Sequence, residues 1–139
     1  MSDLKLYDAK LLRRYYDRRA LSSIGKTTTK FELKKAIWGS GFVKLVNGVP
    51  TVADIPLDTA ELKGVFATTN LILSYASGTI TVRAVLPTGS VPAGQQVEFS
   101  SLGILDEENK LVAVLASTPI YVHDKRSLAV TGAINTNIA

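Results

Sequence analysis

Two short stretches of the sequence contain residue types that bind nucleotides and Mg²⁺. ALSSIGKTTTK includes Gly25, Lys26 and Thr27, the order in which a phosphate-binding loop presents its lysine and hydroxyl group. LGILD ends on Asp106. It could pass for the strand of a nucleotide hydrolase that ends on a magnesium-binding carboxylate. A small nucleotide-binding protein that uses Lys26, Thr27 and Asp106 is therefore one alternative for this chain.

The neighbouring sequence argues against a phosphate-binding loop. Such a loop follows a buried strand and precedes a helix, whose N-terminus faces the phosphates. Here a charged segment with helical spacing precedes Lys26, and a β-branched run follows it. Asp106 leads directly into a turn instead of a crossover helix. We favour a helix end and a plain hairpin at these two places, and we expect no cofactor.

Other catalytic chemistry has little support in the sequence. His123 is the only histidine and there is no cysteine, which excludes multi-histidine and thiolate metal sites. His123 and Asp124 would need a nucleophilic serine, and no G-x-S-x-G motif is present. The acidic run that starts at Asp106 lacks the spacing of a calcium loop. We predict that the protein is not an enzyme and binds no metal.

The segment RRYYDRR, residues 13–19, alternates arginine pairs with aromatic residues. Such a segment can bind nucleic acid, because arginine contacts phosphates and aromatic rings stack on bases. On a helix, Tyr15 would join the apolar side while Arg14 and Arg18 lie four residues apart on another face. Tyrosine and arginine are also enriched at the centres of protein interfaces. A core stripe with a solvated face, a protein interface and a nucleic-acid surface all stay open.

Length and composition indicate one globular domain. The chain has 139 residues, of which 46% are hydrophobic and 20% charged, with a formal net charge of +4. No apolar run approaches the roughly 20 residues that cross a bilayer, and charges interrupt the N-terminus where a signal peptide is apolar. We expect folding in a cytoplasm and a single domain over 1–139, with an N-terminal helix and cap at 1–25 and a mainly β body at 26–139.

Periodicity predicts a helix from Asp3 to Leu21, with Leu4, Leu11, Leu12 and Tyr15 on its buried side. A strand should follow from Thr27 to Trp38, and a long connection from Asn47 to Pro56. The Asp-x-x-Glu pattern from Asp58 to Glu61 suggests one helical turn.

The rest of the chain has the alternation of β-hairpins. One hairpin joins 64–75 to 79–87, a second joins 97–105 to 111–116, and last strands lie at 120–122 and 128–134. The predicted core residues are Leu102, Ile104, Leu111, Val112, Val114, Val82 and Leu86. The fold class that follows is α+β, an N-terminal helix packed on an antiparallel sheet built from hairpins.

Several stretches, in this order, resemble the N-terminal domain of phage tail-collar fibre proteins, the part of a tail fibre that attaches to the baseplate. They are the helix and strand that end at IWGSG, the segment from VPT to DTAEL, the strand GTITVRAVLP, and VEFSSLGILDEENKLVA. The last is the most telling, because it has the glutamate, the Leu-Gly-hydrophobic-hydrophobic-Asp arm, the acidic turn and the Leu-hydrophobic-Ala return of that family.

The resemblance implies a non-enzymatic structural protein of a phage tail or contractile injection particle, found in the virion and made in the host cytoplasm. It implies baseplate or fibre proteins as partners and a homo-oligomer, with a trimer favoured. The chain ends at Ala139 without a shaft or receptor-binding tip, so we expect a stand-alone adaptor or a fibre reduced to its attachment domain. We expect no membrane partner and no small-molecule substrate. The predicted contact residues are Arg14, Tyr15, Tyr16, Arg18 and Trp38.

Overall fold

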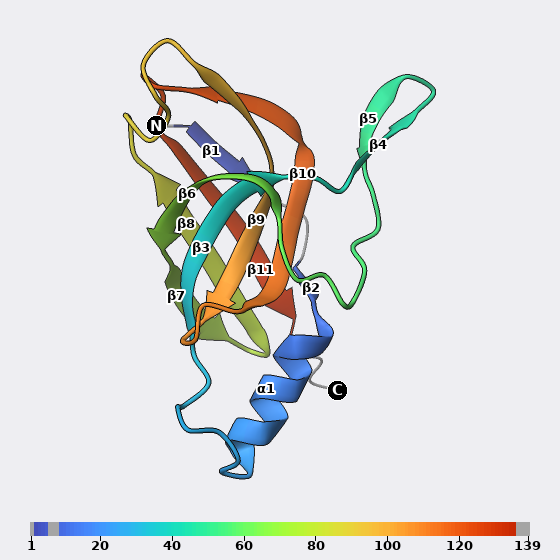
Figure 1. The fold of residues 1–139 in the computed structure, drawn as a ribbon, viewed down its shortest axis with the longest axis vertical. Helices are drawn as coiled ribbons and strands as arrows, with labels where there is room; N and C mark the ends of the chain where they lie inside the picture. The colour runs from blue at the N-terminus through green and yellow to red at the C-terminus, as the bar shows by residue number, and fades with distance from the viewer. Residues whose placement is uncertain (1, 6–8, 136–139) are drawn as a thin grey trace.

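Most of the chain forms β-strands (Figure 1), and the computed structural model describes residues 2–5 and 9–135. The elements in chain order are β1 (Ser2–Lys5), β2 (Lys10–Leu11), α1 (Arg13–Ser23), β3 (Leu33–Ser40), β4 (Val43–Val46), β5 (Val49–Val52), β6 (Lys63–Asn70), β7 (Ile72–Ala76), β8 (Thr79–Leu86), β9 (Gln96–Asp106), β10 (Leu111–His123) and β11 (Leu128–Asn135).

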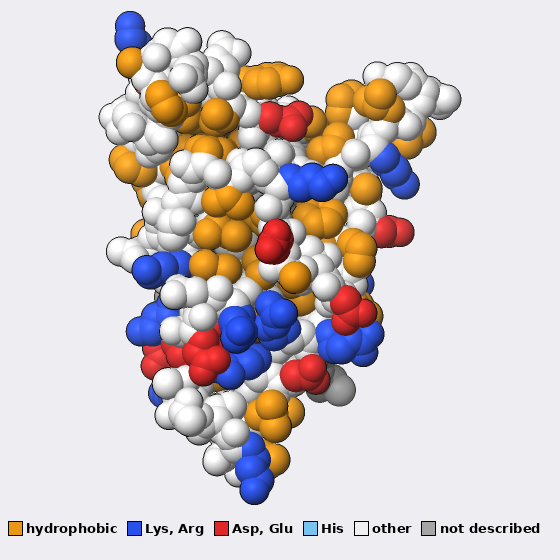
Figure 2. All heavy atoms as spheres, in the orientation of Figure 1, with side chains coloured by type: hydrophobic (Ala, Val, Ile, Leu, Met, Phe, Trp, Pro, Cys, Tyr) orange, Lys and Arg blue, Asp and Glu red, His pale blue; other side chains and the backbone are white. Residues whose placement is uncertain are grey.

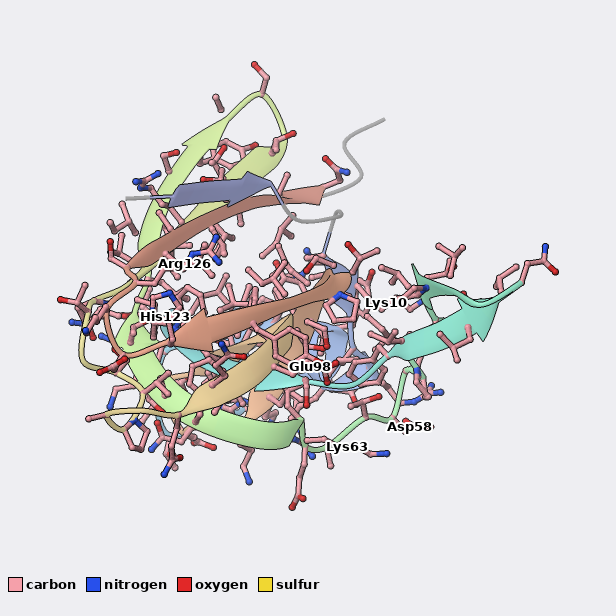
Figure 3. The ribbon with its side chains drawn as sticks, turned by 90° about the horizontal axis from the view of Figure 1, so that it is seen from above. Lys10, Asp58, Lys63, Glu98, His123 and Arg126 are labelled. Atoms are coloured by element: carbon pink, nitrogen blue, oxygen red, sulfur yellow. The ribbon has the colours of Figure 1, made fainter. Side chains whose placement is uncertain are left out.

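Two larger sheets pack face to face, as the view from above shows (Figure 3). One has the strand order β1-β11-β8-β7, and the other has the order β2-β10-β9-β3-β6. Among the residues that the structure describes, the strand pairings of these two sheets are antiparallel except that of β1 with β11, which is parallel. Strands β4 and β5 form a separate two-stranded sheet, which projects from the body (Figure 1).

The main core lies between the two larger sheets. Trp38 from β3, Phe99 from β9 and Leu86 from β8 are completely buried in it. All seven predicted core residues are buried, as expected. Burial alternates from Val82 to Leu86 in β8, but it is continuous along much of β9 and β10, whose side chains lie in both buried clusters. A smaller cluster around Leu12, Leu62 and Leu111 forms a second buried group.

The predicted α+β arrangement, with an N-terminal helix on an antiparallel sheet, is wrong. The helix has only 11 residues and buries only Tyr15, and it lies at one end of the sandwich instead of across a sheet face (Figure 1). It begins at Arg13 and not near Asp3, because Ser2–Lys5 pairs with β11 and Lys10–Leu11 pairs with β10. Leu11 and Leu12 are buried as predicted, but they precede the helix. Pairing with distant strands overrides a local helical spacing here.

Other predicted boundaries change for similar reasons. Residues 27–32 form a loop, and β3 begins only at Leu33. Asp58–Glu61 is not helical; a turn closes when the Thr59 N–H donates to the Pro56 carbonyl at 3.1 Å. The first strand of the predicted hairpin, 64–75, is divided at Leu71 into β6 and β7, which belong to different sheets. Conversely, Ile120–Val122 continues β10 beyond an irregularity in its pairing with β9.

Both predicted hairpin turns are confirmed. β7 and β8 turn at Ser77 and Gly78, and β9 and β10 turn at residues 107–110. Over the described residues, no helix is both long enough and apolar enough to span a membrane.

Candidate protein interface

Ion pairs of Arg18 connect helix α1 to the turn between β9 and β10. Its guanidinium lies 3.1 Å from the Asp106 carboxylate, 2.6 Å from that of Glu107 and 3.1 Å from that of Glu108. The Arg18 side chain is only 14% exposed and the Asp106 side chain is 0% exposed. Removing one partner of such a buried charge pair lowers stability strongly, because the remaining charge stays in a poorly hydrated site.

Asp106 also shapes the turn that carries it. Its Oδ1 accepts hydrogen bonds from the backbone N–H groups of Glu108 and Lys110, both at 2.9 Å. Asn109 adopts a positive φ of 61°, which asparagine tolerates better than most residues. The aspartate that could have held magnesium therefore binds an arginine and two backbone donors, and no cluster of metal-binding side chains occurs among the described residues.

Glu107 connects the turn to the loop that follows the helix. Burial raises its pKa, but hydrogen bonds from the Thr29 hydroxyl and the Glu32 backbone N–H, with the charge of Arg18, outweigh burial. The net result is a pKa below the ordinary value of 4.5. The folded structure therefore favours the ionised form of Glu107.

The glycine and lysine that resemble a phosphate-binding loop end the helix. The Lys26 N–H donates to the Leu21 carbonyl at 2.9 Å, and the Gly25 N–H donates to the Ser22 carbonyl at 3.1 Å. This pair of bonds, with Gly25 at a φ of 72°, is a Schellman cap. A helix precedes Lys26 and the next element is strand β3, which is the reverse of the order that a phosphate-binding loop needs.

The other sequence-predicted contact residues do not form one patch. Trp38 is buried, donates its Nε1–H to the Thr69 hydroxyl at 2.9 Å and packs on Phe99. Tyr15 is buried edge-on against Phe31.

Tyr16 is exposed on the helix, whereas half-buried Arg14 reaches the body of the protein and donates to the Leu111 carbonyl of β10 at 3.5 Å. Figure 2 shows acidic and basic side chains intermixed around this end of the molecule. The helix therefore does not present a purely cationic face to nucleic acid. His123 lies beside Arg126, on the side of the molecule away from the β4–β5 hairpin (Figure 3).

The sequence predicts a long connection from Asn47 to Pro56, whereas the structure has a projecting hairpin of β4 and β5 that overlaps this stretch. Its turn is Asn47-Gly48, with positive φ angles of 51° and 78°, the two residues that a type I′ hairpin turn prefers. We call residues Val43–Val52 the arm. Leu45 is 72% exposed, and Val46 and Val49 near the tip are also exposed. Hydrophobic side chains on the arm are visible in Figure 2.

Strand β7 is a second exposed apolar element. It is one of the two end strands of its sheet in the part of the chain that the structure describes, with β1 at the other end, and all five of its residues are exposed. Ile72 points to one face of the sheet, while Leu73 and Tyr75 point to the other, so neither face of this strand is covered by the sandwich. Tyr75 is 61% exposed.

A mainly β scaffold with uncovered strands of this kind is typical of proteins that assemble with other chains. The family described as Bacteriophage P1 tail fiber protein R matches residues 1–139. The chain is 35% identical over 145 residues to tail fiber protein R of Escherichia phage P1, with 100% of both chains covered. No solved structure matches significantly.

The chain therefore belongs to the family of bacteriophage P1 tail fiber protein R. The predicted relationship to phage tail fibres is confirmed, and the relationship supports a structural component of a phage tail.

Proposed function

We propose that this protein is a non-enzymatic structural component of a phage tail, which joins the baseplate to a fibre. Membership of a tail fibre family supports the tail assignment. The observation that supports assembly with other chains, further copies of this one included, is the pair of uncovered β elements, the arm and β7, whose apolar side chains lie outside both cores. The joining role itself follows the resemblance to tail-collar fibres. Unpaired strand edges readily add a strand from another protein.

We further propose a homo-oligomer, with three copies favoured by the resemblance to tail-collar fibres. Of the five sequence-predicted contact residues, we propose that the exposed Tyr16 and the half-buried Arg14 touch a partner. Arg18, Tyr15 and Trp38 would support that surface from behind, since their side chains are mostly or completely buried in one chain.

Light scattering on the purified protein, combined with deletion of its gene from the phage, tests this function. We expect a mass of three copies, and particles that lack attached fibres when the gene is absent. A single copy at high concentration, together with intact and infectious particles after deletion, would contradict the proposal.

A further inference from the structure

The two edges of the arm are not equivalent. In a hairpin with a two-residue turn, the pair next to the turn exchanges hydrogen bonds and the following pair does not. Val46 and Val49 flank the turn, so Leu45 and Pro50 form the next, non-bonded pair. The bond from the Ala53 N–H to the Phe42 carbonyl, 2.7 Å long, continues the same alternation. The backbone groups of Leu45 and Pro50 therefore point away from each other.

Proline blocks one of these edges. Pro50 has no N–H, so the outer edge of β5 lacks a donor at the position where a new strand would need it. Strand β5 also lies next to β10. On the outer edge of β4, Leu45 offers both a backbone N–H and a C=O, beside a largely exposed apolar side chain. Only the β4 edge of the arm is open to an added strand.

Strand β7 has the same construction. It also precedes a two-residue turn with two positive φ angles, at Ser77 and Gly78, and Ala76 pairs with Thr79 next to that turn. By the same alternation, Tyr75 and Leu73 direct their backbone groups away from β8. Both residues are exposed and apolar.

Strand β6, which lies at the end of the five-stranded sheet opposite β2, differs from β4 and β7. Its pairing with β3 is irregular between Trp38 and Ser40, opposite Gly64, which has a φ of 58°. Such an irregularity discourages pairing at an edge. Of β4, β5, β6 and β7, only β4 and β7 thus have an open, regular edge.

On the basis of the proposed oligomer, we infer that the β4 edge of one copy pairs with the β7 edge of a second copy. The arm and β7 lie on opposite sides of the molecule (Figures 1 and 3), so one chain cannot bring its own two edges together. Pairing of β4 with β4, or of β7 with β7, would join only two copies and leave the other edge uncovered. The head-to-tail contact covers both edges in every copy, and such contacts permit more than two subunits.

Cysteine cross-linking tests this contact, because the chain has no cysteine of its own. Leu45→Cys protein and a size-tagged Tyr75→Cys protein are mixed, allowed to exchange subunits, and treated with a short bismaleimide. We expect a mixed cross-linked dimer as the main product and little product from either variant alone. Thr88→Cys, at an exposed loop position, replaces Tyr75→Cys in the control and should give no product with Leu45→Cys.

A second variant keeps the inference testable if the cross-linker fails to reach. Leu45→Lys should weaken self-association by roughly tenfold or more, because charge on an edge opposes pairing and an anchor side chain is lost. Leu57→Lys, at another exposed leucine outside both edges, should leave association unchanged.

Two results would overturn the inference. One is equal cross-linking in each single-variant sample, which indicates like-with-like pairing. The other is an oligomer, detected by light scattering, that gives no mixed cross-linked product and is unaffected by Leu45→Lys. That result would contradict this contact while still supporting the proposed oligomer. A wild-type monomer would instead contradict both.

Discussion

Two hairpins of this protein use similar local chemistry and have opposite surroundings. The β9–β10 hairpin buries its side chains continuously from Phe99 to Asp106 and from Leu111 to Ser117. The arm also has apolar residues on two strands joined by a tight turn, but its tip is exposed. The difference lies in what covers each hairpin, because β3 and β2 flank β9 and β10 while the arm has no third strand.

Apolar side chains have different roles in the two hairpins. In β9 and β10, leucine and valine stabilise the folded chain, and the acidic turn is held by Arg18. An isolated two-stranded hairpin is at best marginally stable in water, so the apolar residues of the arm contribute little to this chain's stability. We expect these residues to contribute to stability when another chain covers them.

The largest expected difference comes from the same substitution in each hairpin. Leu102→Ala in β9, where the side chain is 1% exposed, should lower the free energy of unfolding by about 2–5 kcal/mol. Leu45→Ala in the arm should leave it nearly unchanged in dilute solution. Urea unfolding of both variants measures this, and a similar loss in both would mean that the arm belongs to the cooperative core.

Two arginines of the same helix give the next comparison. Arg18→Ala leaves the buried Asp106 and the half-buried Glu107 without their cation and should cost about 3 kcal/mol. Arg13→Ala removes only an exposed contact with Asp58, at 2.8 Å, and should have almost no effect on stability. Thermal unfolding at neutral pH separates them; equal effects would show that the acidic turn does not hold the helix.

Acid should weaken the β9–β10 turn through Glu107, whose pKa is lowered in the folded state. The unfolded chain then takes up the proton at a higher pH, so the stabilisation is complete above the ordinary value of 4.5 and is lost as pH falls through the folded pKa. Urea unfolding from about pH 6 to about pH 3 should show a smaller decline for Glu107→Gln than for the wild type. Identical slopes would contradict this role.

The smallest effect is expected at the turn of the arm. Gly48 has a φ of 78°, so Gly48→Ala should destabilise the turn by roughly 1 kcal/mol. Because the arm is outside the core, amide exchange should accelerate in β4 and β5 while global unfolding stays the same. A lower global stability would instead couple the arm to the sandwich.

The hairpins with a buried face were predictable from sequence, since the alternation of Val82, Ala84 and Leu86 reports a covered sheet face directly. The helix start was not, because Leu11 and Leu12 have a helical spacing that is overridden by contacts with β10. The Asn47-Gly48 pair could have revealed the arm, but prolines nearby suggested a loop. The partners of Arg18 are 88 or more residues away in sequence, beyond the reach of local patterns.

Hydrogen exchange at two protein concentrations tests most directly whether the arm and β7 are interface strands. The backbone amides of Leu45 and Tyr75, which point away from their own partner strands, should exchange rapidly in dilute solution and slowly when the protein is concentrated. Amides in β9 and β10 should be protected equally in both. Rapid exchange of Leu45 and Tyr75 at every concentration would contradict the account.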